Sequence, residues 1–376
     1  MSIVYHIISI TDALRSDDTY VMDNLVSNIE HFKKIPFTEL HSGCTDAIVL
    51  CIDQSPNVYD QVATDRLNKI KDVIAANGVR AKFILDSTFL DESLIQSSDD
   101  IIFVSLWRML ALQYCNRQPR NKQVNFDKNL GLFLPGRIHR YNRLVLFKKL
   151  YELNLLNHII WSCQYSYDEL DQLKSFKEKW FSGYDEVKWK KFTSVLPKNL
   201  DIINFDKIGH FGCGFPYDVS LYQNTIFSII AESDILHYTV SEDGPTTISE
   251  KTWKAIMNFH PFIISGNKGT LAKLEKWGYK TFREYTTFPN YNDMNPRKRI
   301  EQTAKNIEFF ARNLQQNQKR VQEDCTHNYK LLKKHYLDDL SILNEFLKDD
   351  WHQNTIDRII ENIAIGNMFM EINTIS

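Results

Sequence analysis

Ser249-Glu-Lys-Thr-Trp-Lys-Ala-Ile256 opens a predicted helix between two apolar runs, Thr225-Ile-Phe-Ser-Ile-Ile-Ala231 and Pro261-Phe-Ile-Ile-Ser-Gly266. Apolar residues from Trp253 to His260 recur at i, i+3, i+4 and i+7, which is the spacing of one helix face. The helix is therefore expected to reach about His260. A strand, a helix and a second strand in this order predict a unit of two parallel strands.

The first turn of this helix combines a cap with two charges. Ser249 can cap the helix by accepting a hydrogen bond from the backbone N–H of Lys251 or Thr252. Glu250 and Lys251 follow, where unpaired N–H groups and the helix dipole create positive potential. A carboxylate is ordinary there, but a lysine runs against the dipole and suggests that an anion such as phosphate binds. The alternative is a solvated helix start with an incidental lysine.

The alternation of strands and helices extends along most of the chain. It predicts an α/β fold with two Rossmann-like parallel-sheet domains and a helical C-terminal segment. Besides the unit above, strands are expected at 3–10, 45–53, 80–86, 100–105, 130–134, 158–163 and 278–282. Helices are expected at 21–32, 62–76, 144–155, 269–277 and, heavily charged, over much of 297–363.

A chain of 376 residues is too long for one ordinary core, so more than one domain is expected. The polar and basic stretch 116–128 is a candidate linker. The expected division is therefore a first α/β domain over 1–128, a second over 129–296, and a helical segment over 297–376. That last segment is expected either to fold back on the N-terminal domain or to mediate assembly.

Composition narrows the class of protein. The formal net charge is −2, so no global basic field indicates a nucleic-acid partner. The six cysteines form no CxxC pair, which argues for a reducing compartment and against a disulfide framework or a zinc site. The start of the chain has no basic region typical of a signal peptide, and no apolar run is long enough to cross a bilayer. A cytoplasmic protein without membrane insertion is expected.

Ligands of open parallel sheets sit outside the carboxyl ends of the strands, and this rule selects the candidate residues. Gly136-Arg-Ile-His-Arg-Tyr-Asn-Arg143 places three arginines at a strand-to-helix turn, with Arg137 the best anion ligand and Arg140 the second. The alternative is a basic, solvated helix start. Glu232 ends an apolar strand and could accept hydrogen bonds from ribose or sugar hydroxyls. Its alternative role is a cap or a salt bridge beside Lys251 or an arginine.

Three aspartates of the first half, Asp12, Asp53 and Asp86, end or follow predicted strands. One of them could act as a general base on an acceptor hydroxyl. For each of them a turn or helix-cap aspartate is the competing interpretation. The histidines have no metal-ligand spacing, so no metal site is predicted. Gly266-Asn-Lys-Gly269 lacks the phosphate-loop signature and is interpreted as a strand-to-helix turn.

Residues 225–232, 248–256 and 260–263, together with Leu132-Phe-Leu-Pro-Gly-Arg-Ile-His-Arg140, resemble the donor site of fucosyltransferase-like glycosyltransferases of the GT-B fold. This group includes enzymes of large bacteriophages and bacteria, and the resemblance spans about residues 130–285. It implies that Lys251 and Arg137 neutralise a donor diphosphate. It implies also that Glu232 and Glu250 hold ribose or the donor sugar, or orient those two bases.

The resemblance implies a nucleotide-sugar-dependent hexosyl- or pentosyltransferase that inverts the anomeric carbon and needs no tightly bound metal or other cofactor. The first domain would then carry the acceptor and the second the nucleotide sugar. The acceptor is either a glycan or a hydroxymethylated base of phage DNA, which would make the protein a DNA-modification enzyme. Basic clusters that could follow a DNA backbone lie at 117–122, 188–191 and 297–299. The competing interpretation of each cluster is a solvated surface, which the net charge of −2 favours. The alternative is a non-catalytic, two-domain protein that binds nucleotide or nucleic acid.

Overall fold

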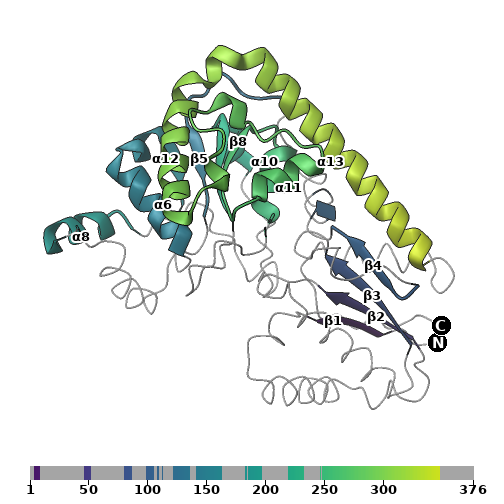
Figure 1. Ribbon diagram of the computed structural model, residues 1–376. Helices are drawn as coiled ribbons and strands as arrows, with labels where there is room; N and C mark the ends of the chain where they lie inside the picture. The colour runs from purple at the N-terminus through teal and green to yellow at the C-terminus, as the bar shows by residue number, and fades with distance from the viewer. Residues whose placement is uncertain are drawn as a thin grey trace. The chain divides into compact units, whose positions relative to one another are not determined.

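The computed structural model describes residues 4–8, 46–51, 80–86, 99–105, 108–109, 112, 122–135, 141–162, 183, 185–196, 219–232, 246 and 248–347. The chain divides into two compact units. The first unit takes the described residues up to 109 and those from Tyr336 onward, and the second takes the described residues from 112 to His335. The whole is a mixed α/β protein with two parallel sheets and a long C-terminal helix (Figure 1).

The first unit contains a parallel sheet whose strands follow the order of the chain. The order is β1-β2-β3-β4, with neighbouring strands parallel throughout. The strands are β1 (Val4–Ile8), β2 (Asp46–Cys51), β3 (Arg80–Asp86) and β4 (Ile101–Val104). All four lie where the apolar runs predict them. The side chains of Phe83, Ile84 and Leu85 are all buried, so the middle of β3 is covered on both faces.

The last part of helix α13 (Gln318–Leu347) belongs to the first unit and contacts it through several side chains. Lys82 of β3 donates a hydrogen bond to the carbonyl oxygen of Phe346, and its ammonium group lies 4.7 Å from the centre of the Phe346 ring. Arg108 pairs with Asp339, and both residues are buried. Chain segments from both halves of the sequence therefore complete the core of the first unit.

The second unit contains a parallel sheet whose strand order departs from the order of the chain. The order is β6-β5-β7-β8, so β5 pairs with β6 on one side and with β7 on the other. The direction of winding reverses at β5, which creates a switch point between β5 and β7. The strands are β5 (Gly131–Phe133), β6 (Ile159–Trp161), β7 (Phe227–Ala231) and β8 (Phe262–Ser265).

Helices cover both faces of this sheet. Helices α6 (Tyr141–Glu152) and α12 (Pro296–Asn313) pack against each other on one side, and α10 (Glu250–Met257) packs against β7 and β8 on the other (Figure 1). Shorter elements are η2 (Leu155–His158), α8 (Glu186–Thr193), α9 (Val219–Gln223), α11 (Thr270–Lys276), η4 (Arg283–Tyr285), η5 (Tyr291–Asp293) and η6 (Leu314–Asn317).

A glycine allows the centre of this sheet to pack closely. A Cβ atom on Gly131 of β5 would lie 2.5 Å from the ring of Phe227 on β7, which is closer than real Cβ contacts come. The Phe227 ring also meets Phe310 of α12 edge to face, with 5.4 Å between ring centres. The absent side chain at Gly131 thus lets one aromatic ring bridge β5 and the covering helix, in the close packing that interiors require.

Three predictions about secondary structure need correction. Helix α10 ends at Met257 rather than near His260, because Phe259 adopts a left-handed backbone with φ of 57°. Residues 278–282 form no strand. The side chain of Asn328 bonds both the N–H and the carbonyl of Lys280, and so replaces a neighbouring strand. Helix α8 lies in the stretch 164–214, for which the sequence predicted no element; Asp185 caps it.

The described part of the candidate linker, residues 122–128, packs onto the second unit. Val124 is buried, and its N–H donates to the side chain of Gln322 on α13. The helices predicted at 21–32 and 62–76 lie outside the described residues. In the part of the chain that the structure describes, no helix has both the length and the apolar character needed to cross a bilayer.

Candidate functional site

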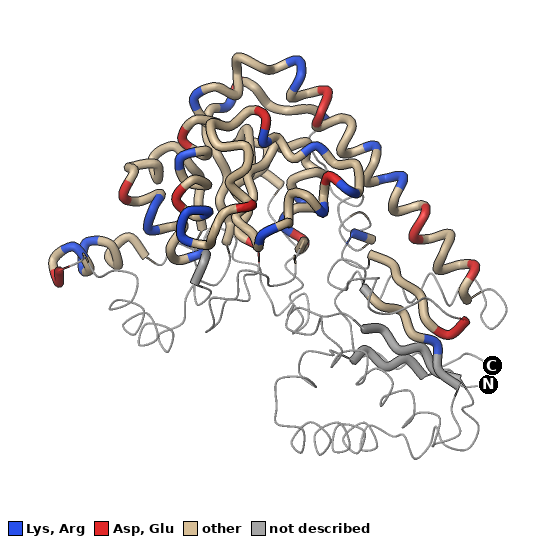
Figure 2. The backbone as a smooth tube through the Cα atoms, viewed as in Figure 1, with Lys and Arg blue, Asp and Glu red and all other residues tan. Residues whose placement is uncertain are grey.

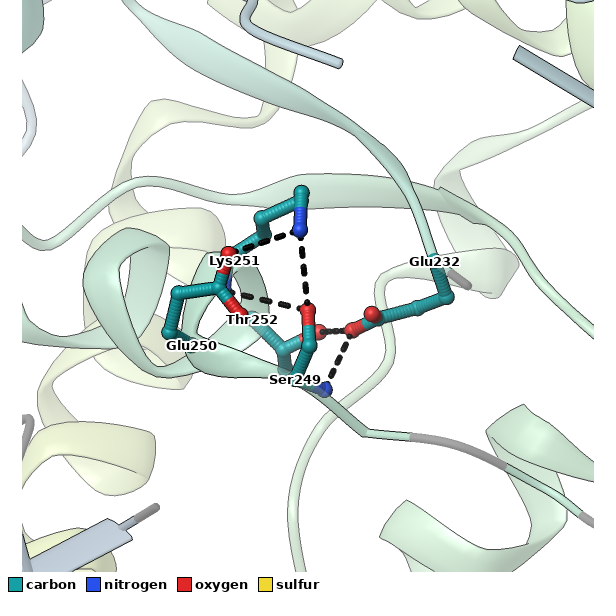
Figure 3. Close-up of polar contacts among 5 residues, drawn as sticks. All are labelled: Glu232, Ser249, Glu250, Lys251 and Thr252. Carbon is teal, nitrogen blue, oxygen red and sulfur yellow. Dashed lines mark hydrogen bonds and ion pairs between the residues drawn. The ribbon is translucent and has the colours of Figure 1, made fainter. Parts of the chain in front are cut away.

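The candidate site lies at the carboxyl edge of the second sheet, beside the switch point between β5 and β7. In open parallel sheets this is where loops diverge and where ligands bind. Glu232 follows directly after β7, and α10 then leads to β8. The predicted residues Glu232, Ser249, Glu250 and Lys251 are brought together here (Figure 3).

Glu232 fastens the end of β7 to the first turn of α10. Its Oε1 atom accepts a hydrogen bond from the backbone N–H of Ser249 at 3.0 Å and another from the hydroxyl of Thr252 at 2.6 Å (Figure 3). The residue has no exposed surface. Of the two roles considered for Glu232, the structure therefore shows the capping role: one carboxylate oxygen satisfies a helix N-terminus.

The environment of Glu232 disfavours its charge. Burial raises the pKa of the Glu232 carboxyl, while Lys251 and the hydrogen bonds from Ser249 and Thr252 pull it downward. Burial is the larger effect, and the pKa lies above its usual value. Removing a carboxylate from water is unfavourable unless hydrogen bonds and a nearby cation compensate, and here they do so only in part.

Ser249 caps α10 as predicted, since its hydroxyl accepts from the backbone N–H of Lys251 at 3.4 Å. The helix is not solvated, however. Thr252 and Trp253 have no exposed surface, and every residue onward to Met257 is buried. The alternative of a solvated helix start is therefore wrong. Lys251 sits in a largely enclosed environment, where charge interactions are screened less than on a surface.

Lys251 is paired with its own neighbour. Its Nζ atom lies 2.7 Å from Oε1 of Glu250 and 3.4 Å from the hydroxyl of Ser249 (Figure 3). Only 18% of the Lys251 side chain and 13% of the Glu250 side chain are exposed. Lys251, which the sequence predicted to bind an anion, therefore forms an ion pair with a carboxylate of the same helical turn. An arriving anion has to compete with that carboxylate.

Two further cations act on Glu250. Burial by itself raises the pKa of Glu250, whereas the charge of Lys251 lowers it. Lys254 and Arg143 lower it further, and the resulting pKa is about 2. Glu250 is thus firmly ionised at neutral pH. Lys254 and Arg143 are themselves buried, with 8% and 6% of their surface exposed.

Sequence reasoning did not select Arg143 or Lys254. Arg143 lies in the first turn of α6, which follows β5, so it comes from the other side of the switch point. Lys254 lies one turn after Glu250 on α10, at the i+4 spacing that brings opposite charges together. Both signals were present: Lys254 by its spacing from Glu250, and Arg143 as the third arginine of the turn after β5.

Five other residues were predicted to belong to the site. Arg137, Arg140, Asp12 and Asp53 lie outside the described residues. Asp86 is the last residue of β3 in the first unit, where the backbone alone is described. Within the described ranges, no group of three or more His, Cys, Asp or Glu side chains is arranged to hold a metal ion.

A second polar pair lies at the opposite edge of the same sheet. Nδ1 of His260 is 3.0 Å from the hydroxyl of Ser228, and Nε2 is 2.8 Å from the carbonyl oxygen of Tyr222. Burial lowers the pKa of His260 to about 4, against the opposing effect of its backbone hydrogen bonds. His260 is 1% exposed, so it is a neutral core residue.

No family model, no curated protein and no solved structure matches this chain.

Proposed function

We propose that this chain is a nucleotide-sugar-dependent glycosyltransferase of the GT-B type, built from two Rossmann-like domains, with its donor at the carboxyl edge of the second sheet. The observation that carries the proposal is the set of three largely buried cations, Arg143, Lys251 and Lys254, around one ionised carboxylate at a sheet switch point. Buried positive charge beside a helix N-terminus favours a phosphorylated ligand. The resemblance of residues 130–285 to donor sites points the same way.

In this reaction the acceptor oxygen attacks the anomeric carbon while the bond from that carbon to the diphosphate breaks. The electron pair of that bond leaves with the nucleoside diphosphate, so negative charge grows on its oxygens. Lys251 and the positive end of the α10 helix dipole would stabilise this charge. An acid of the first domain, one of Asp12, Asp53 and Asp86, would take the acceptor proton.

Glu250 has a defined part in this scheme. In the ligand-free protein it holds the ammonium group of Lys251 at 2.7 Å. When the diphosphate binds, Lys251 turns to the phosphate oxygens, and Arg143 and Lys254 continue to balance the charge of Glu250. The carboxylate thus keeps the lysine ordered before the donor arrives, at the expense of some affinity.

The proposed acceptor is a glycan or a hydroxymethylated base in DNA, and the proposed setting is the cytoplasm. No resident cofactor enters the proposed reaction, in which the nucleotide sugar is a substrate. A base within a duplex would have to leave the stack to be modified.

The test is release of nucleoside diphosphate from a panel of nucleotide sugars, preceded by a thermal-shift screen of the same panel. Lys251→Ala should lower donor turnover by roughly a hundredfold, because a cation facing developing charge contributes on that scale. Lys305→Ala, which removes an exposed lysine of α12, is the control. Full turnover in Lys251→Ala would remove the site assignment. Stabilisation by a nucleotide sugar without any diphosphate release would support a non-catalytic binding protein instead.

The proposed change of partner of Lys251, from Glu250 to the diphosphate, is tested with inorganic pyrophosphate, which lacks ribose and sugar. Glu250→Gln should bind pyrophosphate several-fold more tightly than the wild type, because the competing carboxylate is gone. The double variant with Lys251→Ala should lose that gain. Weaker pyrophosphate binding by Glu250→Gln would contradict this proposed change of partner.

A further inference from the structure

Two segments that are far apart in the sequence form one surface of the second unit. The first is 268–280, which contains α11, and the second is 327–334 in α13. Nε2 of His327 lies 2.8 Å from the carbonyl oxygen of Gly278, and Asn328 bonds both backbone groups of Lys280 at 2.7 and 2.8 Å. These hydrogen bonds hold the two segments side by side.

Lysines accumulate on this surface. The two segments hold seven lysines and one acid, in a chain whose net charge is −2. The acid, Glu275, is already bound by Arg283 at 2.8 Å and by the hydroxyl of Thr281. We call this set of lysines the basic patch, and it appears as blue segments on α11 and the adjoining stretch of α13 (Figure 2). Its members are Lys268, Lys273, Lys276, Lys280, Lys330, Lys333 and Lys334.

The exposed lysines of the basic patch are not neutralised by carboxylates in the described part of the chain. All members of the patch except Lys273 are exposed. Like charges gathered without partners repel one another, and a polyanion that releases its counterions on binding relieves this repulsion.

Two half-exposed aromatic rings lie among these lysines. The ammonium group of Lys273 lies 5.2 Å from the centre of the Trp277 ring, and that of Lys333 lies 5.4 Å from the centre of the Tyr329 ring. Lysines interleaved with aromatic rings suit nucleic acid, because phosphates meet the cations and bases can stack on rings. The stretch from His327 to Lys334 also runs about 10 Å along a straight helix. A linear array of this kind matches a linear chain of phosphates.

We propose that the basic patch binds the phosphate backbone of a nucleic acid. The binding groups are exposed lysines of two segments that Asn328 and His327 hold in register. Lysine ammonium groups bind phosphates without reading bases, so the binding is independent of sequence. The proposal stands apart from the glycosyl-transfer reaction and holds whatever the donor site accepts.

The experiment measures fluorescence anisotropy of a labelled DNA duplex of about 20 base pairs at several salt concentrations. The patch variant carries Lys280→Ala, Lys330→Ala and Lys334→Ala. The matched control carries Lys305→Ala, Arg312→Ala and Lys319→Ala, which removes the same charge from exposed positions on α12 and α13. The patch variant should bind at least tenfold more weakly. Its slope of log affinity against log salt should be shallower by about 0.9 for each phosphate that the variant no longer neutralises.

Three results would overturn the proposal. One is a wild-type protein that does not bind the duplex at low salt. Another is an equal loss of affinity in both triple variants, which would show a response to net charge alone. The third is tighter binding to phosphatidylserine vesicles than to the duplex, if the patch variant loses affinity for the vesicles but not for the duplex. Melting curves of both triple variants that match the wild type keep the comparison free of unfolding.

Discussion

Each unit of the molecule buries a carboxyl group, and the two groups are compensated in different ways. Asp339 in the first unit meets a guanidinium group, with Nε of Arg108 at 2.9 Å from Oδ2. Glu232 in the second unit meets a backbone N–H and a hydroxyl, with Lys251 acting on it only through its charge. Burial raises the pKa of both carboxyls. Arg108 is thus paired within the core of the first unit, whereas we propose that the buried cations of the second unit serve a ligand.

The two sheets also differ in the order of their strands. In the first, the described strands follow one another in chain order, so no switch point lies among them. In the second, β5 stands between β6 and β7, and the buried cations gather beside that reversal. We therefore propose that the reversal of strand order marks the donor-binding edge of the second sheet.

The largest expected effect is on the ion pair of the first unit. Asp339→Ala leaves the buried guanidinium of Arg108 without its carboxylate and should lower the free energy of unfolding by about 3–5 kcal/mol. Asp338→Ala, at the exposed neighbouring position, is the control. Urea unfolding measures both. Equal stability of the two variants would show that Asp339 contributes no more than a surface charge.

The next effect concerns the buried histidine of the second sheet. The pKa of His260 is about 4 in the folded protein and 6.5 when unperturbed. Between pH 4 and pH 6.5 the unfolded chain therefore binds a proton at this residue, and the folded chain does not. Stability is therefore full above pH 6.5 and should fall by about 3 kcal/mol as the pH drops to 4. His260→Gln should flatten this decline in denaturant titrations. His158→Gln, at an exposed site, should not change it.

A smaller loss is expected where Glu232 meets α10. Thr252→Val removes the 2.6 Å hydrogen bond to the carboxyl group and should lower the free energy of unfolding by about 2 kcal/mol. Thr303→Val provides a buried control whose hydroxyl bonds a backbone carbonyl, that of Arg299. If Thr252→Val lowers the free energy of unfolding less than Thr303→Val does, the hydrogen bond to the Glu232 carboxyl group stabilises the fold no more than an ordinary hydroxyl bond.

The smallest effect has the opposite sign. Because the pKa of Glu232 is raised, the folded protein holds this proton more tightly than the unfolded chain, and stability falls as the pH rises through the folded-state pKa. Glu232→Gln keeps an oxygen acceptor without a charge and should be slightly more stable than the wild type at pH 8. Thermal unfolding at pH 5 and pH 8 tests this, and a variant less stable at pH 8 would contradict it.

Local patterns predicted the strands well. β3 matches its predicted bounds of Arg80–Asp86, and the apolar runs placed the other strands to within a few residues. The cap at Ser249 was also predictable, because a serine before two charged residues and an apolar stripe has few other uses. These features depend on neighbours within one turn or one strand, and the sequence displays such neighbours directly.

Features set by distant partners were not predictable. Residues 278–282 look like a strand, but Asn328, 48 positions after Lys280, takes both backbone groups of that residue. The meeting of Arg143 with Glu250 depends on the switch point of the sheet, which no local pattern reveals. The basic patch is hidden for the same reason, since its two rows of lysines become one surface only when α13 lies beside the segment after α11.

Helix α13 also sets the order in which the molecule can be completed during synthesis. Its residues up to His335 belong to the second unit and those from Tyr336 onward to the first. Arg108 leaves the ribosome long before Asp339, which lies 231 positions later. The charge of the buried Arg108 is therefore neutralised only after the end of this helix has been synthesised. By then the residues of the second unit, which end at His335, have all been synthesised. The first unit therefore cannot be complete before the second, in contrast to the usual order in which an N-terminal domain finishes first.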